Sequence, residues 1–177
     1  EGVKAQVVET AQKLNYRPNR LARSLVTGRT NAIGVVPPAT IRNVFLSPFV
    51  RLVWNGIVNE AENRGQDLLL FTGHDRTSEL DAFDSLFDSR IDGLVFIAPP
   101  VESRPFDALI ERKVPFATLN AGPEVPGLHF GVDNAAGVRL AMEHLVGLGH
   151  TRIAHLAGLP SSADARARVE AFRSFAD

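Results

Sequence analysis

The chain has 177 residues and a formal net charge of −1; 45% of its residues are hydrophobic and 22% are charged. This composition is globular and excludes a disordered tail, a collagen-like repeat and a low-complexity linker. The chain contains no cysteine, which excludes disulfides and thiolate zinc sites. No apolar run approaches the ~18 residues of a membrane span, so we expect no membrane partner.

Charge is distributed unevenly along the chain. Residues 1–31 carry six basic and two acidic side chains, a net charge of +4, and residues 32–177 carry a net charge of −5. This asymmetry predicts a basic arm on an acidic globular body. Charge alone is also compatible with a merely solvated segment.

Two short helices are predicted in the basic arm. Apolar residues recur at helical spacing over residues 3–14, and Pro18 ends this pattern because the residue before a proline disfavours the helical conformation. Asn19 can cap a second helix over residues 20–26, which Gly28 can end. Both helices are too short to be stable alone, so we expect the arm to be poorly ordered without a partner.

The body alternates apolar runs with amphipathic segments, which predicts a parallel, doubly wound α/β sheet. The predicted strands are residues 32–36, 67–72, 92–98, 114–120, 127–132 and 151–158, and the predicted helices are residues 48–64, 78–89, 105–112, 134–148 and 162–175. Ligands of such sheets bind outside the carboxyl ends of the strands. The loops at that edge are therefore where we expect a site.

Catalytic and metal-binding patterns receive no support. The five histidines lie on different predicted elements, and the sequence contains neither G-x-S-x-G nor G-x-x-x-x-G-K-[ST]. The pair Asp133-Asn134 begins a helix, so we interpret it as a cap. We expect no enzyme, no metal and no cofactor, because the loops offer hydrogen-bonding groups but no nucleophile–base pair.

The stretch NYRPNRLARSL, followed by TGRT-x-x-IGVV, resembles the join between headpiece and ligand domain in LacI/GalR-family transcription repressors. RIDGLVFIAPP, VPFATLNAG and VDNAAGVRLAMEHLVGLGHTRIAHLAG continue the resemblance through the body. It implies a periplasmic-binding-protein-like effector domain of two α/β subdomains, preceded by the remnant of an all-α helix-turn-helix headpiece. The implied units are residues 1–18 (headpiece remnant), 19–31 (hinge helix and linker), 32–150 (first subdomain) and 151–177 (start of the second subdomain).

Two parts of the family pattern are missing from these 177 residues. The first is the recognition helix that reads the major groove, so this stretch cannot itself read an operator by base contacts. The second is most of the second subdomain, because family members are roughly twice as long.

The resemblance implies a cytoplasmic repressor that forms a homodimer or higher homo-oligomer. Its operator affinity would be controlled allosterically by a small-molecule effector, a sugar or related metabolite. The hinge helix would fold in the DNA minor groove, where Leu25 would wedge between base pairs and nearby arginines would meet phosphates. The ordinary alternative is that Leu25 packs on the body. The implied DNA-contacting residues are Asn19, Arg20, Ala22, Arg23 and Leu25.

Effector contacts follow from the loops and the family motif together. Arg168 occupies the arginine of the family's R-x-x-G-aromatic motif, although Ala171 replaces the glycine. The planar guanidinium suits hydroxyl pairs or a carboxylate. Asn120 ends a strand and can both donate and accept, as sugar hydroxyls require. The other implied contacts are Asp164, Phe49 and Arg51.

Each of these residues also has an ordinary structural explanation. Arg168 can form a surface salt bridge, Asn120 can form a turn and Phe49 can lie in the core. Asp164 can complement the positive end of a helix dipole.

Two other function classes stay open on the sequence. An exported solute-binding protein of the same architecture is the main alternative, and the basic hinge sequence argues against it. An α/β enzyme is disfavoured by the lack of a nucleophile and base in the loops.

Overall fold

The computed structural model describes residues 2–16, 20–38, 47–71, 90–101 and 105–176. The helix predicted at residues 78–89 lies outside the described residues. The elements are α1 (Gly2–Lys13), α2 (Arg20–Thr27), β1 (Ala32–Val36), α3 (Pro48–Arg64), β2 (Asp67–Leu70), β3 (Gly93–Ile97), α5 (Pro105–Glu111), β4 (Phe116–Leu119), β5 (Leu128–Phe130), α6 (Asn134–Gly147) and α7 (Ala163–Ala176).

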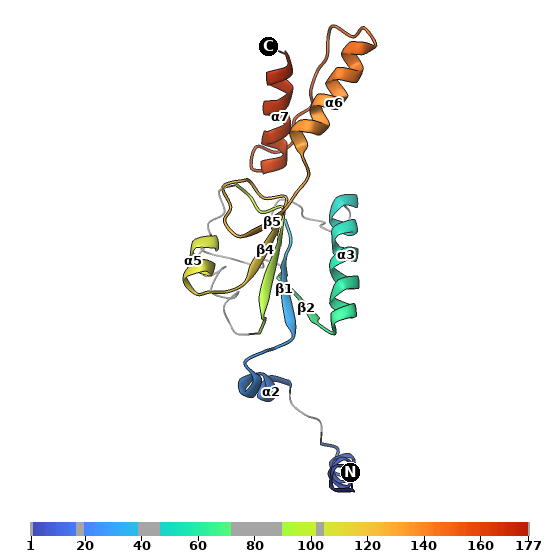
Figure 1. Ribbon diagram of the computed structural model, residues 1–177, viewed down its shortest axis with the longest axis vertical. Coiled ribbons are helices and arrows are strands. Elements are labelled where there is room, and N and C mark those ends of the chain that lie inside the picture. Colours follow the sequence, from blue (N-terminus) through green and yellow to red (C-terminus); the bar gives the residue numbers. More distant parts are fainter. Residues whose placement is uncertain (1, 17–19, 39–46, 72–89, 102–104, 177) are drawn as a thin grey trace.

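Five parallel strands form one sheet in the order β2-β1-β3-β4-β5. Helices α3 and α5 lie on opposite sides of this sheet (Figure 1). The predicted doubly wound α/β fold is therefore confirmed. All five strands run in the same direction, so their carboxyl ends meet at one edge, and α6 and α7 extend beyond that edge (Figure 1).

Helix α3 begins and ends where its sequence predicts. The Ser47 hydroxyl accepts a hydrogen bond from the backbone N–H of Val50, and Pro48 occupies the first turn, where its missing N–H costs nothing. Gly65 ends the helix with a φ of 64°, in the left-handed region that glycine adopts without strain. Val50 and Ala61 are the buried residues of the helix.

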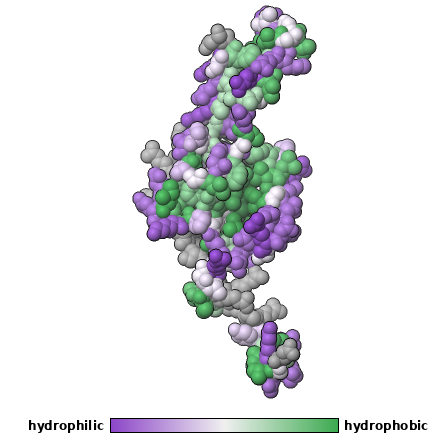
Figure 2. Space-filling model, viewed as in Figure 1, coloured by the Kyte–Doolittle hydropathy of each residue, from purple (hydrophilic) through white to green (hydrophobic). Residues whose placement is uncertain are grey.

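An aromatic cluster forms the core between the sheet and α5. The rings of Phe96 and Phe106 meet edge to face, with centroids 5.2 Å apart, and Phe116 lies 5.4 Å from Phe106. Leu94 and Leu109 are almost fully buried in this cluster, which also includes Phe71. In the space-filling view, apolar residues gather over the middle of the body and polar residues flank them (Figure 2).

The prediction of a strand at residues 151–158 is wrong. These residues form no strand in the structure, and the Leu156 side chain is 97% exposed. A strand is stabilised by hydrogen bonds to a neighbouring strand, and the described part of the chain places none beside this segment. The segment instead links α6 to α7, which pack against each other.

Helices α1 and α2 lie beyond the amino edge of the sheet, away from the body (Figure 1). The two predicted arm helices are therefore present, and α1 has no buried residue. Leu25 is 88% exposed, so the alternative that it packs on the body is wrong. The marginal stability of these helices stays a prediction. Among the described residues, no helix is long and apolar enough to cross a membrane.

Candidate functional site

The chain turns sharply where β3 and β4 reach the carboxyl edge. Ala98 and Asn120, each the first residue after its strand, have φ values of 45° and 54°. Asparagine adopts this left-handed conformation more readily than most residues. The Asn120 backbone N–H donates to the Phe130 carbonyl over 2.8 Å. Both turns lie where a strand ends at the carboxyl edge of the sheet.

Four half-buried polar side chains form a continuous hydrogen-bond network at this edge. The Asn120 Nδ2 donates to Asp164 Oδ2 over 2.6 Å, and the Asn134 Nδ2 donates to Asp164 Oδ1 over 2.8 Å. The Arg168 Nη1 donates to Asn134 Oδ1 over 2.7 Å. The network therefore joins the end of β4, the first turn of α6 and the first half of α7.

The hydrogen bonds of the network can be compared with the ordinary structural explanations of Asp164 and Arg168. Asp164 does lie in the first turn of α7, as a dipole-complementing charge would, but both of its oxygens also accept side-chain hydrogen bonds. Arg168 is half-buried and donates to a neutral amide, which differs from an exposed ion pair. The Asn134 amide therefore links the guanidinium to the carboxylate.

A cavity of about 220 Å³ opens next to this network. It lies between the start of α3, the loop after β3 and the segment that leads into α7. Ligand pockets usually measure roughly 300–1,000 Å³, so this cavity fits a small molecule or part of one. Its lining residues are Pro38, Phe49, Ala98, Pro100, Gly158, Leu159, Ser161, Ser162, Ala165 and Arg168.

Two close approaches hold the walls of this cavity together. The Val101 N–H donates to the Ser161 carbonyl over 3.0 Å, which ties the loop after β3 to the segment before α7. A Cβ added at Gly158 would lie 3.0 Å from the Ala165 Cβ, so this loop packs tightly against α7. The cavity and the network share Arg168.

The structure brings together four of the five predicted effector residues. Phe49 and Arg168 line the cavity, and Asn120 and Asp164 belong to the network. Phe49 is 41% exposed, so it is not a core residue. Arg51 is exposed and does not line the cavity. It follows Phe49 by two positions, which turns its side chain about 200° around the helix axis.

Sequence reasoning missed the role of Asn134. Asp133 is the N-cap of α6 and accepts from the Ala136 N–H over 2.8 Å, so the prediction of a cap is confirmed for Asp133. The side chain of Asn134 instead bridges Asp164 and Arg168. The sequence did contain a signal for this role. One residue, Asp133, is enough to cap the helix, so the second polar residue, Asn134, was free for another contact.

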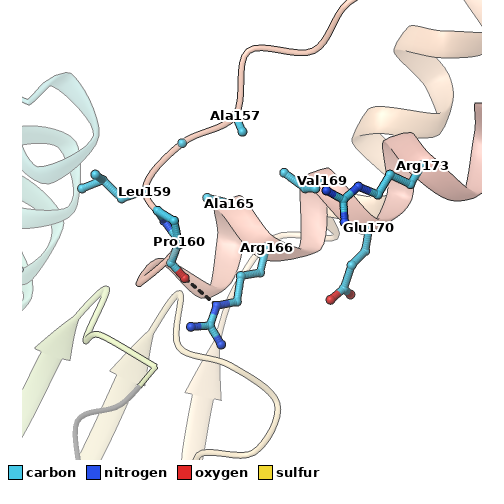
Figure 3. A pocket seen from close by; sticks show the side chains of 9 residues that line it. Ala157, Leu159, Pro160, Ala165, Arg166, Val169, Glu170 and Arg173 are labelled. Atoms are coloured by element: carbon cyan, nitrogen blue, oxygen red, sulfur yellow. Dashed lines mark hydrogen bonds between the residues drawn. The ribbon is translucent and has the colours of Figure 1, made fainter.

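A second hollow, of about 330 Å³, lies against α7 (Figure 3). Apolar side chains such as Leu159 and Val169 line it, together with the unpaired segment that precedes α7. Arg166 turns back in Figure 3 and its Nε donates to the Pro160 carbonyl over 2.5 Å. This surface has the apolar character of a packing face and lacks the linked amides of the first site.

The described members of the predicted DNA-contacting set lie on α2, beyond the amino edge of the sheet (Figure 1). Asn19 lies outside the described residues, and the backbones of Arg20 and Arg23 are helical. Ala22 and Leu25 are exposed on α2. Among the described residues, no three His, Asp or Glu side chains are grouped so that they could hold a metal ion.

Open parallel α/β sheets bind their ligands outside the carboxyl ends of the strands, which is where this polar network and cavity lie. The fold is that of a periplasmic-binding-protein-like domain. Residues 30–176 match the family described as "Periplasmic binding proteins and sugar binding domain of LacI family". The chain belongs to this family, and the predicted LacI-type membership is confirmed.

Named relatives are transcriptional repressors. The chain is 29% identical to the HTH-type transcriptional repressor PurR of Aliivibrio fischeri (strain MJ11) over 181 residues, which cover 100% of this chain and 52% of the relative. It is 30% identical to the ribose operon repressor of Escherichia coli (strain K12) over 178 residues, which cover 98% of this chain and 52% of the relative. The chain thus spans about half the length of the curated relatives it matches.

A solved structure shows the same fold. The lac repressor dimer bound to operator and the anti-inducer ONPF superposes with a TM-score of 0.76 at 27% sequence identity. The match covers 97% of this chain and 51% of the repressor chain.

Proposed function

We propose that the chain is part of a DNA-binding transcriptional regulator, a repressor, whose operator affinity is controlled by a small-molecule effector. The named relatives support this reading, since they are the HTH-type transcriptional repressor PurR, a ribose operon repressor and a lac repressor dimer bound to operator. The regulator would act in the cytoplasm as a homodimer or higher homo-oligomer. It would have no catalytic role.

The observation that carries the proposal is the linked network of Asn120, Asp164, Asn134 and Arg168 beside the cavity. Amides both donate and accept, a carboxylate accepts, and a guanidinium donates through a planar fork. Such a set matches a molecule with several neighbouring hydroxyl groups. Phe49 adds an apolar ring at the cavity wall, which can stack on the C–H face of a sugar.

These chemical preferences favour a carbohydrate effector. Phe49, Asn120, Asp164 and Arg168 would contact it, and Asn134 would join them although it was not predicted. Arg51 is not part of this proposed set, because its exposed side chain neither lines the cavity nor belongs to the described network.

The DNA-contacting surface would be the arm. Leu25 presents an apolar side chain that is 88% exposed on a basic segment, which suits a wedge in the minor groove. The proposed contacts are Asn19, Arg20, Ala22, Arg23 and Leu25.

Effector and DNA would bias the same two-state equilibrium. An effector shifts that equilibrium only by the difference between its affinities for the two conformations. The carboxyl edge holds the proposed effector site, and the arm leaves from the amino edge of the same sheet (Figure 1). A change at the site would therefore reach the arm through the strands between them.

The proposal is tested in two steps on the complete regulator. Its operator is first selected from a random DNA pool, and a panel of sugars and nucleosides is screened by thermal shift. A ligand at 100 times its Kd adds about 2.7 kcal/mol to the free energy of unfolding. We expect a sugar to stabilise the protein and to change its operator affinity; selection of no DNA sequence would contradict the proposal.

The exported solute-binding protein is the alternative with a distinct outcome. It would bind the same class of ligand with no effect on DNA, and fractionation of the producing cells would place it outside the cytoplasm. The basic residues of the arm favour the regulator, because sugar binding at the opposite edge has no use for them.

A further inference from the structure

Asp92 lies at the amino edge of the sheet, immediately before β3, and its half-buried carboxylate grips the segment that leads from α2 into β1. The Oδ1 atom accepts from the Thr30 backbone N–H over 2.6 Å and from the Thr30 hydroxyl over 2.8 Å. The Oδ2 atom accepts from the Asn31 backbone N–H over 2.9 Å. Three donors from two adjacent residues therefore converge on one carboxylate.

Backbone hydrogen bonds continue this attachment into the sheet. The Asp92 N–H donates to the Ala32 carbonyl over 2.7 Å, and the Asp67 N–H donates to the Asn31 carbonyl over 2.8 Å. The Thr30 hydroxyl also accepts from the Ala32 N–H over 3.2 Å. The linker is thus held by the strands on both sides of β1 before β1 begins.

On its other side the linker is joined just as closely to α2. The Gly28 N–H donates to the Ser24 carbonyl over 2.8 Å, and Gly28 has a φ of 66°. The Thr27 hydroxyl accepts from the Arg29 N–H over 3.3 Å and donates to the Arg29 carbonyl over 3.1 Å. Arg29 alone therefore separates the end of the helix cap from the residues held by Asp92.

We propose that Asp92 is a positioning residue that fixes the direction in which α2 leaves the body. A linker residue free of contacts has two soft backbone dihedrals, and several such residues would let the helix swing widely. The bonds to Thr30 and Asn31 remove that freedom from the residues nearest the sheet. The functional value of a fixed direction rests on the proposed function, in which α2 is the segment that contacts DNA.

We call the three hydrogen bonds from Thr30 and Asn31 to the Asp92 carboxylate the clamp. The surroundings of this carboxylate favour its charged form. Burial raises the pKa of Asp92. The hydrogen bonds from Thr30 and Asn31 and the charge of Arg29 together lower it by more, so the pKa lies below its ordinary value of 3.8. The clamp is therefore complete above pH 3.8 and weakens as the pH falls through the lowered pKa. An amide at this position would direct an NH₂ group at one of the donors.

The test is a distance measurement between spin labels on α2 and on the body. The 177 residues contain no cysteine, so Val26→Cys and Asn59→Cys introduce unique labelling sites once any cysteine elsewhere in the protein is changed to serine. Val26 and Asn59 are both exposed, on α2 and α3 respectively. Labelled protein is diluted with unlabelled copies, so that only distances within one protomer contribute. We expect a single distance peak in the unsubstituted protein, measured without DNA, because Asp92 holds Thr30 and Asn31 whether or not α2 is fully helical. We expect this single peak to be lost in Asp92→Ala and Asp92→Asn.

Matched variants separate the clamp from general damage to the fold. Thr30→Ala removes the hydroxyl and should widen the peak partly, whereas Thr30→Ser keeps the hydroxyl and should restore it. Asp107→Asn makes the same chemical change on the exposed surface of α5 and should leave the peak unchanged. An unchanged peak in both Asp92 variants overturns the proposal. A similar loss in Asp107→Asn would also overturn it, because the effect would not then belong to the clamp.

Operator binding supplies the separate functional readout. If the peak is lost in Asp92→Asn and operator affinity falls while effector affinity is kept, both the clamp and the proposed function are supported. If the peak is lost but operator affinity is unchanged, the clamp stands and the proposed role of α2 on DNA fails.

Discussion

Arg168 donates a hydrogen bond of 2.7 Å to Asn134, although 34 positions separate the two residues in the chain. Arg168 lies on α7 and Asn134 opens α6, so this bond joins two helices at the carboxyl edge of the sheet. Because Asn134 also donates to Asp164, movement of one helix changes the surroundings of the other. The contact makes the proposed effector site sensitive to the arrangement of α6 and α7.

Arg168→Ala should lower effector affinity and leave operator binding intact. Loss of a charge-assisted hydrogen bond in a closed site costs about 1.5–3 kcal/mol, or roughly a 10- to 150-fold loss of affinity. Arg168→Lys should fail nearly as badly, because an ammonium lacks the planar fork. Calorimetric titration measures both variants, with Arg173→Ala on the exposed part of α7 as the control. Unchanged affinity in Arg168→Ala would remove Arg168 from the site.

Asn134→Ala should also weaken effector binding. The substitution removes the bridge between Arg168 and Asp164, and each lost hydrogen bond to a charged group contributes about 1.5–3 kcal/mol when the group is shielded from water. Asn134 is only half-buried, so we expect an effect at or below the lower end. Titration against Asn59→Ala, an exposed asparagine on α3, supplies the comparison. Equal affinities would mean that the network only supports the fold.

Leu25→Ala should weaken specific operator binding far more than non-specific DNA binding. The side chain is 88% exposed and uncharged, so its loss removes an apolar wedge and no phosphate contact. The slope of log affinity against log salt should therefore stay the same, because that slope counts neutralised phosphates. Fluorescence anisotropy with operator and random duplexes at several salt concentrations measures both quantities. A uniform loss on all DNA would argue against the wedge.

Helix α2 should be stable only on DNA. It has 8 residues, and isolated helices shorter than about 12–15 residues are marginal in water. Amide hydrogen exchange over residues 20–27 should be fast in the free protein and slow in the operator complex. Exchange in β1 should be slow in both states and serves as the internal reference. Strong protection of residues 20–27 without DNA would contradict this prediction.

Gly34→Ala should destabilise the body. A Cβ at Gly34 would lie 2.6 Å from Phe71 Cε2, 2.7 Å from Leu94 Cδ2 and 2.9 Å from Ile91 Cδ1, so three core side chains would have to move. Overpacking of this kind typically costs about 1–3 kcal/mol. Denaturant unfolding measures the change in the free energy of unfolding.

Gly137→Ala is the matched control for this prediction. A Cβ at Gly137 would meet no atom within 4 Å, and the residue lies inside α6. Alanine in a helix interior is more favourable than glycine by about 0.5–1 kcal/mol. The control should therefore keep or raise stability, and equal losses in both variants would remove the steric explanation.

The sequence by itself determined the elements whose signals are local. Ser47, Pro48 and Gly65 mark the ends of α3, because caps depend on residues within one turn. The apolar runs of β1 and β3 identified buried parallel strands, because a strand covered on both faces carries apolar residues on both. The family motif also indicated the edge at which Asn120, Asp164 and Arg168 meet.

Tertiary structure decided whatever depends on distant partners. Residues 151–158 carry a strand-like pattern, yet a strand also needs a neighbour, and the described residues supply none. Asn134 was predicted as part of a cap, and only the packing of α6 against α7 brings it between Asp164 and Arg168. Hydrogen bonds across such separations are set by how helices and strands pack, which no local spacing of residues encodes.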